Sequence, residues 1–208
     1  MDAATQLADA LSRYRDLHPL VLAIPRGAVP MAALIASRLG GALDVVLVRK
    51  LHAPGAPEFA IGAVDESGWV YLAPHASEVG ATFAYVDEQK LFELEELQRR
   101  RELYTPGRPP IEASRRIVIV VDDGLATGST MVAALHAVRQ RAPARLVCAV
   151  PVASPESARL VAEHADEVVC LQTPRRFNAV SQFYAAFPQL GDDEVVSLLR
   201  EARTAPAA

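Results

Sequence analysis

The residues best suited to chemistry stand together in one run of the chain, Ile117–Thr130, which reads IVIVVDDGLATGST. Two adjacent carboxylates, Asp122 and Asp123, end an apolar stretch and begin a turn of small residues. Carboxylate oxygens accept hydrogen bonds, so at this place they suit the vicinal hydroxyls of a sugar or the water shell of a metal ion. The pattern therefore predicts a polar ligand site where the apolar stretch ends.

The turn after the carboxylates has the composition of an anion-binding loop. Gly128 carries no side chain, so an anion can approach the backbone closely there. Thr127, Ser129 and Thr130 offer hydroxyl groups, and the helix expected to follow adds the positive end of its dipole. A plainer alternative is a strand-to-helix turn whose acids only cap the helix.

These residues need a strand before them and a helix after them. Ile117–Val121 is almost wholly apolar, as in a central strand covered on both faces, and Ser129–Gln140 is predicted to be a helix. Further strands and helices alternate along the chain at Asp2–Arg15, Leu20–Ile24, Met31–Leu39, Asp44–Val48, Leu146–Val150, Pro155–His164 and Val168–Leu171. We therefore expect an α/β fold with a doubly wound, Rossmann-like parallel sheet, whose ligands gather at the carboxyl ends of the strands.

The alternation breaks between residues 51 and 114. Leu51–Glu58 contains two prolines and a glycine and is predicted to be a mobile loop. Phe59–Val64 and Trp69–Leu72 are predicted to form a hairpin, and Tyr85–Tyr104 a long charged helix. We therefore divide a single domain, residues 1–208, into a core of about 18–50 and 115–172, an inserted flap at 51–114 and a small C-terminal hood at 173–203.

Bulk composition narrows the class of protein. Of 208 residues, 51% are hydrophobic and 22% charged, so a sizeable core can form. The net charge of −4 argues against a nucleic-acid partner, and no apolar run is long enough to cross a bilayer. Cys148 and Cys170 lie in apolar runs and are predicted to be reduced thiols, which favours a cytoplasmic location.

The run IVIVVDDGLATGST resembles the fingerprint with which type I phosphoribosyltransferases bind 5-phosphoribosyl 1-diphosphate (PRPP). The resemblance implies that Asp122 and Asp123 bind the ribose hydroxyls and act in catalysis. It implies that the 5′-phosphate is bound by Ala126, Thr127, Gly128, Ser129 and Thr130. Mg²⁺ is the implied cofactor, held by PRPP itself and, through water, by the two aspartates.

The same resemblance suggests where pyrophosphate binds. The family places a pyrophosphate loop after the first strand, often with an unusual peptide, and here Arg26 and Gly27 follow Leu20–Ile24. Arg49 and Lys50 end the second strand, where family members carry a basic residue against the phosphates. Arg26 and Lys50 are the implied catalytic cations. Leu51–Glu58 corresponds to the family's mobile lid.

The acceptor is less determined than the donor. Ala126 replaces the aspartate found in enzymes for 6-oxopurines, and Gly124 replaces the aliphatic residue of the adenine enzymes, so neither specificity is transferred. In the hood, Pro174–Phe187, a heterocycle could stack on Phe177, Phe183 or Tyr184, and an acidic group could meet Arg175 or Arg176.

The resemblance implies a glycosyltransferase of nucleotide metabolism that moves the phosphoribosyl group of PRPP to a nitrogenous acceptor, a nucleobase being favoured, and releases pyrophosphate. The alternative is a non-catalytic, PRPP-sensing regulator on the same fold. PRPP synthesis is disfavoured because no nucleoside-triphosphate motif is visible, and a plain flavodoxin-like binding protein is the remaining alternative. Leu91, Leu94 and Leu97 suggest a homodimer.

Overall fold

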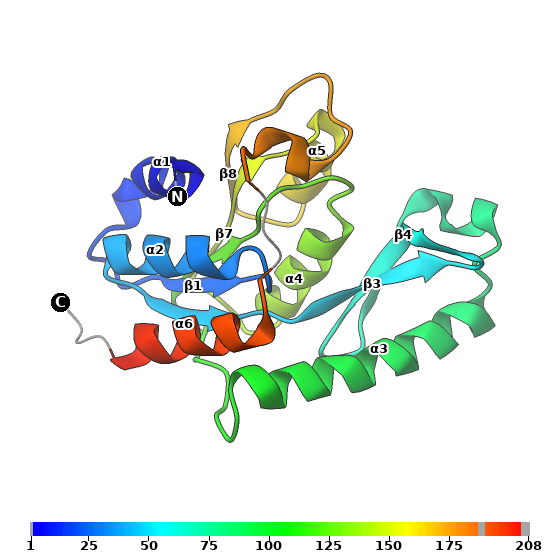
Figure 1. Cartoon of the computed structure of the whole chain (residues 1–208), viewed down its shortest axis with the longest axis horizontal. Coiled ribbons are helices and arrows are strands. Elements are labelled where there is room, and N and C mark those ends of the chain that lie inside the picture. Colours follow the sequence, from blue (N-terminus) through cyan, green and yellow to red (C-terminus); the bar gives the residue numbers. More distant parts are fainter. Residues whose placement is uncertain (1, 187–189, 205–208) are drawn as a thin grey trace.

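A computed structural model describes residues 2–186 and 190–204 of the chain. Its centre is a parallel sheet with the strand order β2-β1-β6-β7-β8 (Figure 1). The strands are β1 (Leu20–Ala23), β2 (Ala42–Val45), β6 (Ile117–Val121), β7 (Arg145–Val152) and β8 (Glu167–Gln172). The direction of winding reverses between β1 and β6, so the crevice where ligands bind in such sheets lies between their carboxyl ends.

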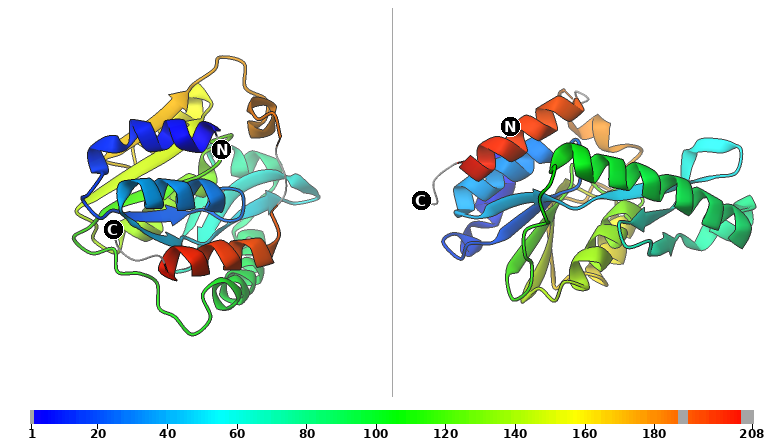
Figure 2. Two further views of the ribbon diagram at one scale, coloured as in Figure 1. Left: turned by 60° about the vertical axis from the view of Figure 1, so that its left-hand side comes forward. Right: turned by 90° about the horizontal axis from the view of Figure 1, so that it is seen from below.

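Helices cover both faces of this sheet, which confirms the doubly wound α/β fold. One face carries α1 (Asp2–Ala10), α2 (Val29–Leu39) and α6 (Asp192–Thr204); the other carries α4 (Ser129–Arg139) and α5 (Pro155–Ala162) (Figure 2). Side chains of a strand alternate between the two layers. In β6, Ile119 and Val121 pack with the first group of helices, whereas Val118 and Val120 pack with the second.

The flap is built on a second, antiparallel sheet that projects to one side of the core (Figure 1). It contains β3 (Val48–Ala53), β4 (Ala56–Asp65) and β5 (Val70–Leu72), followed by a short 3₁₀ helix at Pro74–Val79 and by α3 (Phe83–Tyr104). The hairpin of β4 and β5 and the long helix are confirmed.

The interpretation of Leu51–Glu58 as an irregular loop is wrong. This segment forms the end of β3, a tight turn at Pro54-Gly55 and the start of β4. Pro57 stands near the first residue of its strand, where a missing N–H is tolerated, and so does not interrupt the pairing. The pairing is irregular at His52, and whether the hairpin moves stays a prediction.

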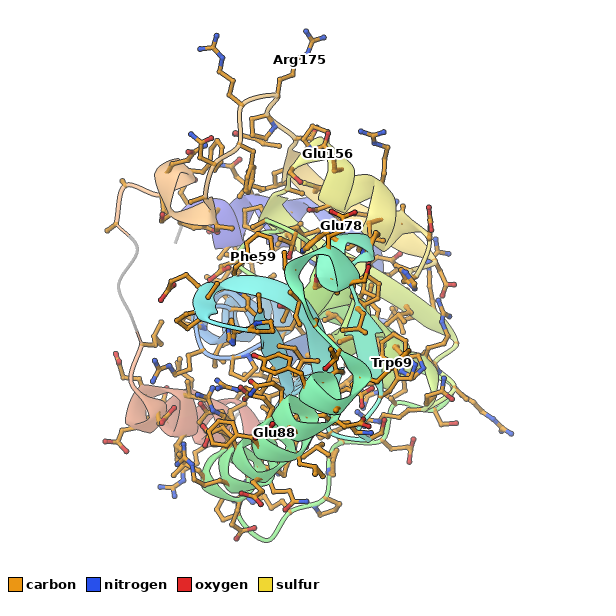
Figure 3. The ribbon with its side chains drawn as sticks, turned by 90° about the vertical axis from the view of Figure 1, so that its right-hand side faces the viewer. Phe59, Trp69, Glu78, Glu88, Glu156 and Arg175 are labelled. Atoms are coloured by element: carbon orange, nitrogen blue, oxygen red, sulfur yellow. The ribbon has the colours of Figure 1, made fainter. Side chains whose placement is uncertain are left out.

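The flap hairpin contacts helix α4 of the core through Trp69 and Asp65. The rings of Trp69 and His136 stack with their centroids 3.7 Å apart, and His136 Nδ1 lies 3.3 Å from Asp65 Oδ2 (Figure 3, Trp69).

In α3, Leu97 is buried within the chain, so the suggestion that it packs on another subunit is wrong. Leu94 is partly buried against the same core, and Leu91 alone of the three is 64% exposed. A homodimer stays a prediction.

The hood runs over the carboxyl end of the sheet and contains one 3₁₀ helix, Val180–Phe183 (Figure 1). Phe187, which was included in the hood, lies outside the described residues. Helix α6, which the sequence grouped with the hood, instead packs against α2 and β2, and its Val195 and Leu199 are buried there.

Candidate functional site

A cavity of about 480 Å³ opens at the reversal point of the sheet. Its walls come from three segments, Ile24–Gly27 after β1, Asp122–Gly128 after β6, and Asn178–Ser181 of the hood. Lys50, Thr130 and Met131 complete its lining. Most residues singled out in the sequence thus meet in one place.

The two aspartates lie where β6 ends, in a poorly solvated position. Burial raises the pKa of the Asp122 carboxyl well above its ordinary value, and the neighbouring Asp123 raises it further. Burial also raises the pKa of Asp123, while the positive charge of Lys50 opposes the rise. Two adjacent, partly buried carboxylates repel each other, so hydroxyl donors or a cation would relieve an unfavourable arrangement.

The loop between the aspartates and α4 is held from behind. Gly128 precedes α4 with φ of +79°, a conformation that favours glycine. Ser157 Oγ donates to the carbonyl oxygen of Ala126 at 2.5 Å, and Leu125 N–H donates to Val152 O at 2.9 Å. No described residue accepts a hydrogen bond from the N–H groups of Ala126, Thr127 or Gly128. These donors and the N-terminus of α4 are available to an anion.

The turn after β1 approaches the aspartates closely. The peptide bond between Pro25 and Arg26 is cis. A Cβ atom added to Gly27 would collide with the Asp123 carboxylate, so only glycine fits at this position without rearrangement. Arg26 Nη1 lies 3.6 Å from Asp192 Oδ1, and its side chain remains 38% exposed beside the cavity.

The two basic residues that end the expected second strand lie in β3 and have different surroundings. Lys50 lines the cavity, whereas Arg49 donates through Nε to Glu93 Oε2 of α3 at 2.6 Å. Glu93 is buried, so this ion pair fastens α3 to the flap sheet. The structure therefore does not bring Arg49 to the cavity. His52 of the same strand does not line the cavity either, and its carbonyl accepts a hydrogen bond from Tyr85.

The aromatic residues of the hood do not line this cavity. Phe177 and Phe183 contact each other with ring centroids 5.2 Å apart. Tyr184 OH donates to the carbonyl oxygen of Asp123 at 2.6 Å, and burial raises the pKa of this phenol. Tyr184 thus fastens the hood to the aspartate loop. Arg175 points into solvent at the tip of the hood (Figure 3).

The sequence reasoning missed the hood residues that do reach the cavity, Asn178, Ala179, Val180 and Ser181. They are small or uncharged and stand in an irregular segment, so no periodicity or charge pattern marks them. It also missed Ser157, whose hydroxyl supports the loop from α5. No sequence pattern indicates that this serine, in the first turn of a helix, would contact the loop.

The family model described as "Phosphoribosyl transferase domain" matches residues 1–188. The chain belongs to the phosphoribosyl transferase family. It is 42% identical over 204 residues to a protein of Mycobacterium tuberculosis H37Rv named "Putative phosphoribosyl transferase Rv0571c". The match covers 97% of this chain and 46% of the relative, so the chain spans about half the length of the curated relatives that it matches.

Solved structures of this transferase fold resemble the chain to different degrees. The protein TT1426 of Thermus thermophilus is 45% identical, has a TM-score of 0.79, and the match covers 96% of this chain and 95% of that one. A hypoxanthine-guanine phosphoribosyltransferase of Bacillus anthracis is 15% identical with a TM-score of 0.43, over 85% of this chain and 78% of that one. In the described part of the chain, no helix is long and apolar enough to span a membrane.

Proposed function

We propose that this chain binds PRPP in the cavity between β1 and β6 and transfers its phosphoribosyl group to a nitrogenous acceptor, releasing pyrophosphate. The observation that carries this proposal is that hydrogen-bond acceptors suited to a sugar and hydrogen-bond donors suited to a phosphate line the same cavity. Two adjacent carboxylates suit ribose hydroxyls, and the free N–H groups of Ala126–Gly128 suit a phosphate on the same sugar. The cytoplasmic location expected from the sequence belongs to this proposal.

In the proposed complex each end of PRPP has its own partners. The 5′-phosphate accepts hydrogen bonds from Ala126, Thr127, Gly128 and Thr130 and faces the positive end of α4; Ser129 is buried and does not line the cavity. Asp122 and Asp123 accept from the ribose hydroxyls. Arg26 and Lys50 lie in the same lining and supply positive charge for the pyrophosphate. Because Gly27 has no side chain, its backbone can lie directly beside the Asp123 carboxylate.

Magnesium fits the residues of this cavity. Asp122 and Asp123 are hard oxygen ligands whose pKa values burial raises, so a divalent cation near them offsets both their repulsion and their poor solvation. When bound, Mg²⁺ neutralises charge on the leaving pyrophosphate. The two aspartates would hold it through water molecules, while PRPP oxygens supply direct ligands.

The chain's own residues then work by position and charge. The bond from C1 to the pyrophosphate oxygen breaks with its electrons on oxygen, while the acceptor nitrogen approaches from the opposite side. Arg26 and Lys50 stabilise the negative charge that develops on the leaving group. The carboxylates of Asp122 and Asp123 orient the sugar and favour the positive charge that develops at C1. No covalent intermediate is needed.

The direct test is a calorimetric titration of the protein with PRPP and Mg²⁺. We expect one site per chain, with competition by ribose 5-phosphate and by pyrophosphate, because each occupies part of the same cavity. Absence of binding, or binding that neither fragment affects, would overturn the proposal. Release of pyrophosphate with an acceptor then separates a transferase from a PRPP-sensing regulator, which would bind PRPP without turnover.

Removing the cations at the pyrophosphate end should weaken binding selectively. We expect Arg26→Ala and Lys50→Ala each to lower the affinity for pyrophosphate about tenfold or more, since a hydrogen bond to a charged group contributes about 1.5–3 kcal/mol. Arg175→Ala is the matched control, because it removes one positive charge that points into solvent (Figure 3). Equal losses in all three variants would show only a general effect of charge. The measurement is calorimetric titration with magnesium pyrophosphate.

A further inference from the structure

The hood packs directly on the aspartate loop at Gly124. A Cβ atom added to Gly124 would lie 2.8 and 2.9 Å from the two methyl carbons of Val180 and 3.0 Å from a methyl carbon of Val152. Carbon atoms in favourable contact are about 3.5–4.0 Å apart. No unoccupied layer therefore separates the backbone of Gly124 from the side chain of Val180.

This packing decides whether a flat ring can lie between the loop and the hood. A ring stacked between two surfaces needs about 3.5 Å on each side, so the surfaces must be about 7 Å apart. The methyl groups of Val180 stand much closer than that to Gly124. Val180 therefore fills the space next to Gly124, and no ring fits between these two residues.

The rest of the acceptor's surroundings follow from the proposed position of PRPP. An in-line displacement puts the acceptor on the side of C1 away from the pyrophosphate, and therefore away from Arg26 and Lys50. The cavity lining that remains for it includes Asn178–Ser181 of the hood. This part of the described lining contains an amide, a hydroxyl and two aliphatic side chains, with neither a ring nor a charge.

The aromatic side chains of the hood have other positions. Phe177 borders a neighbouring hollow with Tyr71 and Ser157, and Phe183 borders another beside α1. Tyr184 is bonded to the Asp123 carbonyl. None of the three lines the cavity that holds the aspartates. A planar base would therefore find no aromatic ring to stack on in the described part of this cavity.

We infer that the acceptor is a small, uncharged, non-aromatic nitrogen nucleophile of the size of ammonia or a short alkylamine, and that Val180 excludes planar bases. This inference rests on the proposed function and narrows its acceptor. The nitrogen lone pair forms the C1–N bond as the C1–O bond breaks onto pyrophosphate, and the proton left on nitrogen passes to pyrophosphate or water. Asn178 and Ser181 supply the polar groups that face the incoming nitrogen.

The test compares acceptors for wild type, Val180→Ala and the control Val196→Ala, which removes the same two methyl groups from α6, away from the cavity. Pyrophosphate release is measured at saturating PRPP and Mg²⁺ with ammonium chloride, methylamine, adenine, hypoxanthine and uracil. We expect the wild type and Val196→Ala to use the amines at least tenfold better than any base, by kcat/KM. Val180→Ala should gain at least fivefold in base turnover relative to amine turnover, measured at PRPP concentrations that saturate this variant.

Several outcomes would overturn the inference. Wild-type turnover of any of the bases at a kcat/KM equal to that of the amines contradicts it directly. So does an unchanged ratio of base to amine turnover in a folded Val180→Ala chain. PRPP binding without turnover of any acceptor also overturns it, while leaving the PRPP site intact. Failure to bind PRPP, measured separately by calorimetry, is instead a failure of the proposed function and removes the basis of this inference.

Discussion

A chain carrying both Asp122→Asn and Asp123→Asn should lose at least 100-fold in affinity for PRPP and at the same time become more resistant to unfolding at neutral pH. The loss follows from two hydrogen bonds to charged acceptors, each worth about 1.5–3 kcal/mol, where about 1.4 kcal/mol is a factor of ten. The measurement is calorimetric titration with PRPP and Mg²⁺. An affinity within threefold of the wild type would contradict the assignment of the aspartates.

The gain in stability follows from the same two side chains. The folded state raises the pKa of Asp122 well above its ordinary value of 3.8, so it binds a proton more strongly than the unfolded chain does. The carboxyl's favourable contribution is therefore fully present below 3.8 and is lost as pH rises through the raised pKa. At neutral pH the carboxylates destabilise the fold, and asparagine removes that cost. Sites built for a ligand commonly carry such a cost in stability.

Thermal unfolding without magnesium at a series of pH values checks this sign. From pH 4 upward, the wild type should lose more stability than the double variant. Asp166→Asn is a control of opposite sign, because a hydrogen bond from Arg139 holds the pKa of Asp166 below its ordinary value. That variant should be slightly less stable than the wild type at neutral pH, since the group is on the surface. Parallel pH profiles for the wild type and the double variant would refute the claim that the ionised carboxylates destabilise the fold.

The central strands and the doubly wound fold could be predicted because local and global signals agree there. Ile117–Val121 is apolar at every position, as a strand buried on both faces must be, and the structure gives β6 the same bounds. The flap was harder, because Pro54 and Gly55 are equally compatible with a tight turn and with a longer loop. Backbone pairing between β3 and β4 across these two residues shows that they form the turn.

The composition of the cavity depended on features that sequence does not express. Arg49 and Lys50 are adjacent basic residues in a strand, so they point to opposite sides, and only the position of α3 shows which one meets Glu93. The hood residues Asn178–Ser181 carry no charge or periodicity, yet they form one wall. Tyr184 was expected to meet a ligand because it is aromatic, but its hydroxyl bonds to Asp123.

Gly27→Ala should lower PRPP affinity about tenfold or more while leaving a folded chain. The new methyl group would collide with the Oδ2 atom of Asp123. That carboxylate has little freedom to withdraw, since Tyr184 holds the backbone of Asp123 and the hood packs on the next residue, Gly124. Crowding of this kind costs about 1–3 kcal/mol, and here it falls on two groups proposed to touch PRPP.

Gly107→Ala is the matched control for this substitution. Gly107 has φ of +61° with nothing within 4 Å of an added Cβ, so the variant pays a backbone cost without a collision. Calorimetric titration with PRPP and Mg²⁺, beside thermal unfolding, separates the two effects. We expect Gly107→Ala to lower the unfolding temperature slightly at full affinity, and Gly27→Ala to lose affinity out of proportion to its stability. Full PRPP affinity in Gly27→Ala would mean that the turn after β1 can move away from Asp123, and the proposed pyrophosphate position would have to be redrawn.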